Sequence, residues 1–130
     1  MTILIAVLAV IIIIVLFKSG SSKGVNQVAA EEAGSIIKDA KAMLLDVRTQ
    51  EEFHEGHIKG AKLIPVSEIN DRLNELDSMK DRQILVYCRS GRRSNVASKI
   101  LIKRGFTKVI NLKGGIIAWV NAGNRVIKGT

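Results

Sequence analysis

The sequence contains a single cysteine, Cys88, among 130 residues. One thiol cannot close an internal disulfide, and there is no second thiol to resolve a reaction at the first. Any sulfur bound at Cys88 must therefore leave to an external acceptor. We expect neither a metal site nor another cofactor, because His54 and His57 have no cysteine near them in the sequence.

Acidic residues are absent from the last part of the chain. Residues 1–81 contain 9 Lys and Arg against 12 Asp and Glu, whereas residues 82–130 contain 11 Lys and Arg and no acidic residue. The cysteine thus lies in a positive field, which suits an anionic substrate, an anionic membrane leaflet or a nucleic acid. Aromatic residues make up only 4% of the chain and no recognition motif accompanies the charge, so no nucleic-acid partner is expected.

The amino terminus has no charged residue in an unbroken apolar run from Ile3 to Phe17. As a helix it would span roughly 22 Å, short of a hydrocarbon core of about 30 Å, and local thinning together with a snorkelling Lys18 can cover the difference. Since this segment has no polar face, it predicts one transmembrane helix. We assign residues 1–18 to a membrane anchor, 19–24 to a flexible tether and 25–130 to a globular domain.

The flanking residues predict how this segment is oriented. A signal peptide carries basic residues before its apolar run, and here none precedes Ile3. Ser19 and Ser21 resemble a cleavage site, which keeps a cleaved signal peptide and an exported domain as the alternative. Lys18 and Lys23 follow the run, which predicts an amino terminus outside and a domain in the cytoplasm. The short tether predicts a cysteine close to the bilayer.

Strand and helix patterns alternate from residue 24 onward, which predicts an α/β domain with a mainly parallel sheet. Helical patterns occupy residues 29–38, a short segment that opens with the capping box Thr49 to Glu52, a stripe at Ile69, Leu73 and Leu76, a segment from about Ser94, and the residues after Gly114 and Gly115. Predicted strands cover residues 43–45, 63–64, 84–87 and 109–112.

Cys88 directly follows the apolar strand Ile84–Tyr87 and begins a turn that ends near Ser94. Ligand sites of α/β sheets occur at the carboxyl ends of strands, where the following helix directs its unpaired N–H groups. Three arginines lie within five positions of the thiol: Arg89, Arg92 and Arg93. A buried, inert cysteine is the alternative interpretation. The clustered cations favour a reactive thiolate, because both cations and helix amino termini lower the pKa of a cysteine.

Three segments resemble the motifs of one family, the rhodanese-like domain. They are LDVRTQEEFHEGHIKGAKLIP at Leu45–Pro65, CRSGRRS at Cys88–Ser94 and NLKGGIIAW at Asn111–Trp119. The resemblance implies a central, mainly parallel sheet with helices on both faces. It also implies a sulfurtransferase in which Cys88 attacks the outer sulfur of a small anionic donor such as thiosulfate. The resulting persulfide would pass its sulfur to cyanide, a thiol or a protein acceptor.

The turn contains the groups that such chemistry needs. Backbone N–H groups around Ser90 and Gly91 would surround the transferred sulfur, and Gly91 permits the positive φ that closes the ring. We expect Arg89, Arg92 and Arg93 to bind the anion. Asp46 and Arg48 end the neighbouring strand and are expected to support the turn, Asp46 through a salt bridge. We expect His57 to stabilise a turn rather than to act in catalysis.

Two other functions stay open at this point. The domain could be a membrane-tethered persulfide carrier or a protein-docking module without efficient turnover. It could also be a phosphatase or arsenate reductase, since related phosphatases share the fold. Their CX5R loop has an arginine six positions after the cysteine, where this chain has Ser94.

Overall fold

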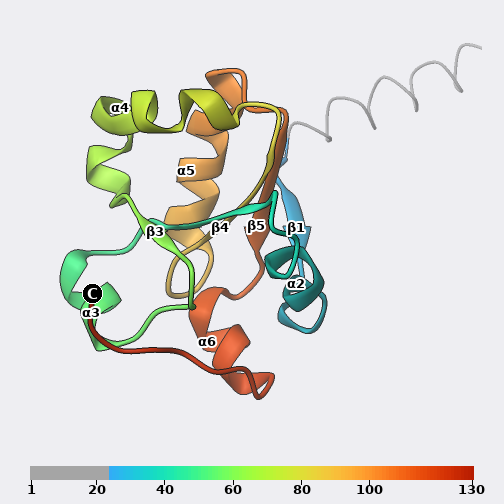
Figure 1. Cartoon of the computed structure of the whole chain (residues 1–130), viewed down its shortest axis with the longest axis vertical. Helices are drawn as coiled ribbons and strands as arrows, with labels where there is room; N and C mark the ends of the chain where they lie inside the picture. Colours follow the sequence, from blue (N-terminus) through green and yellow to red (C-terminus); the bar gives the residue numbers. More distant parts are fainter. Residues whose placement is uncertain (1–23) are drawn as a thin grey trace, which may run out of the picture.

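The computed structural model describes residues 24–130, which form one five-stranded parallel sheet (Figure 1). Its spatial order is β1-β5-β4-β2-β3, and every neighbouring pair runs parallel. The strands are β1 (Asn26–Val28), β2 (Met43–Asp46), β3 (Lys62–Leu63), β4 (Gln83–Tyr87) and β5 (Lys108–Leu112). The prediction of an α/β domain with a parallel sheet is confirmed.

Helices cover both faces of this sheet. They are α2 (Ala30–Ile37), α3 (Gln50–Glu55), α4 (Ile69–Arg72), α5 (Arg92–Lys103) and α6 (Gly115–Asn121), with 3₁₀ segments η1 (Val66–Glu68) and η2 (Leu73–Met79) beside α4. One core packs α5 and the α4 region on the sheet, and the other core packs α2 and α6 on the opposite face.

The central strand β4 explains why two cores form. Side chains alternate between the faces of a strand, so Ile84 and Val86 belong to the core under α5 while Leu85 and Tyr87 belong to the core under α2 and α6. All four are buried. An uninterrupted apolar run is typical of a parallel strand covered on both faces, and here it carries Cys88 to the carboxyl edge of the sheet.

Three features differ from the sequence-based expectation. The edge strand β1 was not predicted, because Asn26 and Gln27 are exposed and the strand is held by backbone pairing with β5. Helix α5 begins at Arg92 rather than near Ser94, since Gly91, with a φ of 100°, ends the turn. Val96 follows the apolar pattern of α5, yet its side chain is half exposed.

The described chain begins on the amino side of the sheet. β1 runs parallel to β5 and β4, and Asn26 lies level with Ile110, so Gly24 precedes the sheet's midline while Cys88 follows β4 at the opposite edge. The expectation that the short tether leaves the cysteine beside the bilayer concerns residues outside the described part of the chain and stays a prediction.

The predicted transmembrane segment lies outside the described residues, and so does most of the tether. Within residues 24–130, none of the helices combines the length and the apolar character needed to span a bilayer. The membrane anchor therefore stays a prediction.

Candidate active site

The sulfur of Cys88 lies at the amino terminus of α5, buried with 1% of the residue exposed. The N–H of Gly91 donates a hydrogen bond to Sγ at 3.1 Å, and the hydroxyl of Ser94 donates another at 3.4 Å. Both donors belong to the cap and first turn of this 12-residue helix. Their partial positive charge, together with the helix dipole, favours an anion at Sγ.

The pKa of Cys88 is lowered from its ordinary value. Burial of the thiol acts in the opposite direction, because it disfavours the charged form. Hydrogen bonds from the Ser94 hydroxyl and from the backbone N–H groups of Ser94, Gly91 and Ser90 outweigh it. The sequence suggested two causes, the arginines and the helix amino terminus, and the largest contributions that lower this pKa come from hydrogen bonds within the loop and the first turn of α5.

The start of α6 supports the cysteine loop from behind. The N–H of Ile116 donates to the carbonyl of Cys88 at 2.9 Å, and the N–H of Ile117 donates to that of Arg89 at 3.2 Å. Gly115 makes this approach possible, since a Cβ there would overlap the backbone of both Cys88 and Arg89. The glycine pair predicted to form a turn thus also allows two backbone segments to touch.

The side chain of Asn111 on β5 connects the cysteine loop with the edge strand β1. Its side-chain amide donates to the carbonyl of Gly91 at 3.2 Å and to Oε1 of Gln27 at 3.0 Å. The loop is therefore held from β5 and from the edge strand β1. Because Gly91 supplies an N–H to the sulfur, restraint on its carbonyl also orients that donor.

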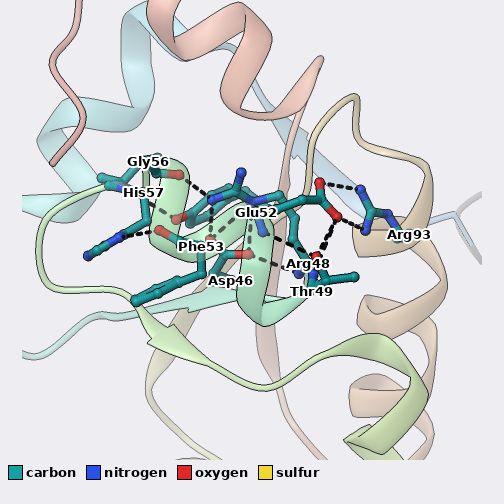
Figure 2. A network of polar contacts seen from close by, with 10 residues as sticks. Asp46, Arg48, Thr49, Glu52, Phe53, Gly56, His57 and Arg93 are labelled. Atoms are coloured by element: carbon teal, nitrogen blue, oxygen red, sulfur yellow. Dashed lines mark hydrogen bonds and ion pairs between the residues drawn. The ribbon is translucent and has the colours of Figure 1, made fainter. Parts of the chain in front are cut away.

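The three loop arginines occupy different environments. Arg93 forms two hydrogen bonds to Glu52, from Nη1 at 2.7 Å and from Nη2 at 2.9 Å (Figure 2). Glu52 also completes the capping box of α3 with Thr49, and its pKa is lowered to about 2, chiefly by Arg93. Arg93 is therefore engaged by a carboxylate rather than free for a donor anion. Arg89 and Arg92 are exposed, and neither forms an ion pair within residues 24–130.

Asp46 and Arg48 form a buried ion pair at the end of β2, with Nη2 2.7 Å from Oδ2. Nη2 of Arg48 also donates to the carbonyl of Gly56 at 2.6 Å, which ties the end of β2 to the end of α3 (Figure 2). The salt bridge expected for Asp46 is present, and its hydrogen bonds run between Asp46 and Arg48. Through the further bond from Arg48 to Gly56, the pair joins β2 to α3 rather than to the cysteine loop.

His57 is buried next to α3. Its Nδ1 donates to the carbonyl of Phe53 at 2.8 Å, and its ring stacks on that of Phe53 with centroids 3.6 Å apart (Figure 2). Its backbone pairs with Ile127, which fastens the carboxyl-terminal segment. These contacts indicate that His57 stabilises the packing of α3 and the carboxyl-terminal segment.

The family model described as the rhodanese-like domain matches residues 29–122. The chain belongs to this family. Its rhodanese-like domain is similar to a sulfurtransferase of Allochromatium vinosum, 38% identical over 104 residues that cover 79% of this chain and 95% of that protein.

Two further comparisons agree. A putative sulfur carrier protein of Bacillus subtilis, YrkF, is 42% identical over 84 residues, which cover 65% of this chain and 44% of that protein. Among solved structures, a rhodanese-related protein of Thermoplasma volcanium aligns with a TM-score of 0.71 and 29% identity, over 78% of this chain and 97% of that one. The resemblance seen in the three sequence motifs is confirmed.

Three residues around Cys88 in the rhodanese-like fold were not predicted as site residues from the sequence. Ser94 was noted for the arginine it replaces, although its first-turn position gives its hydroxyl to the sulfur. Asn111 and Gly115 lie in the segment NLKGGIIAW, which carried the family resemblance. Their contacts with the loop depend on sheet register and on helix packing, so the motif alone did not indicate them.

Proposed function

We propose that this protein is a sulfurtransferase that moves a sulfane sulfur from a thiosulfate-like donor through a Cys88 persulfide to a thiol or cyanide acceptor. The observation that carries the proposal is the cysteine sulfur at the amino terminus of α5, with hydrogen bonds from Gly91 and Ser94 and a lowered pKa. A thiolate is the nucleophilic form of cysteine, so this environment favours the attacking species at neutral pH.

The proposed reaction has two displacement steps. In the first, the Cys88 thiolate attacks the outer sulfur of thiosulfate, a new S–S bond forms, and the old S–S bond breaks as sulfite leaves with its electron pair. In the second, cyanide or an acceptor thiolate attacks the outer sulfur of the persulfide. The Cys88 thiolate leaves with its electron pair, which regenerates the enzyme. Neither step needs a second cysteine in the chain.

The loop contains suitable groups for both steps. The donors that stabilise the thiolate act on Sγ in both steps, first when Sγ attacks the donor and again when it takes back the electron pair as the persulfide breaks. Arg89 and Arg92, which have no ion pair within residues 24–130, are the proposed contacts for the sulfonate end of the donor. Arg93 fixes the loop to α3 through Glu52.

The same geometry disfavours a phosphatase or arsenate reductase. A CX5R loop needs its arginine at the position of Ser94, whose hydroxyl instead donates to Sγ. The nearest candidate, Arg93, is engaged by both carboxylate oxygens of Glu52. Neither residue offers a guanidinium to a bound oxyanion.

A thiosulfate assay with the full chain tests the proposed function. Incubation with thiosulfate should add the mass of one sulfur atom to the protein, and later addition of cyanide should release thiocyanate over many turnovers. Cys88→Ala should abolish both results. A persulfide without turnover would indicate a carrier, and an unmodified thiol would overturn the proposal.

We also propose that residues 3–17 anchor the protein in a membrane as a single-pass segment, with the amino terminus outside and the domain in the cytoplasm. The support is the uncharged apolar run, the two lysines after it and the lack of a basic residue before it. Cytoplasmic placement would also keep the cysteine in a reducing compartment. The alternative is cleavage near Ser19 or Ser21 with export of the domain.

A further inference from the structure

Apolar side chains are exposed on the two helices that meet at the cysteine loop. Ile117 and Val120 on α6 are 43% and 48% exposed, and Val96 on α5 is 50% exposed. Ile117 directly borders the loop, because its N–H bonds to the carbonyl of Arg89. Val120 lies one helical turn further along the same face. Exposed apolar groups beside a reactive group indicate an interaction site.

Two arginines accompany the apolar side chains of α6, and neither forms an ion pair within the part of the chain that the structure describes. The carbonyl of Arg89 accepts the N–H of Ile117, and Arg92 follows Gly91, which lies against the backbone of Gly114 at the start of α6. The acidic residue that reaches the loop, Glu52, is engaged by Arg93. The surface therefore offers positive charge and apolar area together, and its complement is a partner with acidic and apolar side chains.

The burial of the sulfur distinguishes small acceptors from protein acceptors. Cyanide can reach a sulfur at the base of the loop without contacting the surrounding helices. A protein thiol must be presented on a protruding segment, whose neighbouring residues then meet the surface around the loop. These helices should affect transfer to a protein without affecting transfer to cyanide.

We propose that the loop surface, formed by Arg89, Arg92, Ile117 and Val120, docks a protein sulfur acceptor whose cysteine is flanked by acidic and apolar side chains. This inference rests on the proposed sulfurtransferase function and identifies its acceptor class. The surface lies at the carboxyl edge of the sheet, on the side away from Gly24, where a soluble partner has access.

Two synthetic cysteine peptides of equal length test the proposal on the full chain loaded with persulfide. One carries Asp, Glu, Leu and Phe around its cysteine, and the other carries Lys in place of Asp and Glu. At low salt, transfer to the acidic peptide should be faster by about tenfold, because opposite charges speed encounter. The advantage should shrink as salt screens the charges.

A pair of variants separates docking from chemistry. Val120→Ser should lower kcat/KM for the acidic peptide by about threefold, since an apolar contact is lost, while thiocyanate formation is unchanged. The matched control is Ile102→Ser, a residue of similar exposure at 45% near the other end of α5, which should change neither rate.

Equal rates for the two peptides, or an acidic-peptide rate unchanged in Val120→Ser, would overturn the docking proposal while leaving the sulfurtransferase intact. Loss of thiocyanate formation in the unmodified chain would instead overturn the proposed function. The peptide comparison and its salt dependence use the unmodified protein, so they hold even if a variant fails to fold.

Discussion

The hydroxyl of Ser94 reaches the Cys88 sulfur from the first turn of α5, at 3.4 Å. This hydrogen bond favours the charged form of the sulfur and is among the causes that lower the pKa of Cys88. Ser94→Ala should therefore raise the pKa of Cys88. The rate of alkylation by iodoacetamide, measured against pH, should shift to higher pH.

Ser98→Ala is the matched control, because the Ser98 hydroxyl is also buried on α5 but donates to the Ser94 carbonyl at 2.7 Å rather than to the sulfur. The dependence of the alkylation rate on pH in Ser98→Ala should stay close to that of the unmodified protein. An alkylation profile unchanged by Ser94→Ala would show that the thiolate does not depend on this hydroxyl.

Glu52 joins α3 to the cysteine loop through Arg93, and its pKa of about 2 lies below the ordinary 4.5. A carboxyl group whose pKa is lower in the folded than in the unfolded chain stabilises the fold at pH values above its unfolded-state pKa. That contribution is lost as the pH falls toward 2. Both side chains are partly exposed, so Glu52→Gln should lower the free energy of unfolding at pH 7 by only about 0.5–1 kcal/mol.

Urea denaturation of both proteins, at neutral pH and at several acidic values, checks this prediction. The difference between them should narrow from about pH 4.5 downward and vanish near pH 2. Glu55→Gln provides the control, since Glu55 is exposed on the same helix and forms no ion pair within residues 24–130. A difference that persists near pH 2 would assign the effect to something other than the ion pair.

At the scale of elements, the contact between α6 and the cysteine loop depends on Gly115. Its φ is +60°, and a Cβ would overlap the backbone of Cys88 and Arg89. Gly115→Ala should therefore force α6 away from the loop. We expect a loss of at least about 3 kcal/mol in the free energy of unfolding, together with slower persulfide formation, because the loop donors shift.

Gly123→Ala isolates the backbone contribution. Gly123 has a similar positive φ of +87°, but no heavy atom lies within 4 Å of a Cβ placed there. The substitution should lower the free energy of unfolding by about 1–2 kcal/mol and leave the rate of persulfide formation unchanged. Chemical denaturation and the rate of sulfur uptake from thiosulfate measure both variants. Similar losses in both would show that close approach at Gly115 is unimportant.

Several elements were predictable because local patterns determine them. The capping box Thr49–Glu52 opens α3, as predicted from residue types alone. Strand β1 and the exposure of Val96 were not predictable. A three-residue edge strand has too little side-chain pattern, and whether an apolar helix face is covered depends on which neighbour packs there.

For the whole molecule, the proposed anchor and the described domain should be separable. The described residues 24–130 form two hydrophobic cores among themselves, so we expect a variant without residues 1–23 to fold. We expect the full chain in the membrane fraction after alkaline washing and the deletion variant in the soluble fraction. Both should transfer sulfur to cyanide at similar rates.

Protease treatment of intact cells and of inverted membrane vesicles tests the orientation. The domain of the full chain should be cleaved only in the inverted vesicles if it faces the cytoplasm. Recovery of a shortened, exported protein that begins near Ser19 or Ser21 would contradict the anchor and support a cleaved signal peptide.

The sequence by itself determined the α/β order, the place of Cys88 at the end of a strand and the family, because strand and helix periodicity and short motifs are local properties. The tertiary structure alone decided what holds the cysteine loop. Glu52 lies 41 positions before Arg93 and Asn111 lies 20 positions after Gly91, yet packing brings each pair into contact. The contact with Glu52 engages Arg93, whereas Arg89 and Arg92 stay exposed, because a side chain's partners are set by the elements that pack around it.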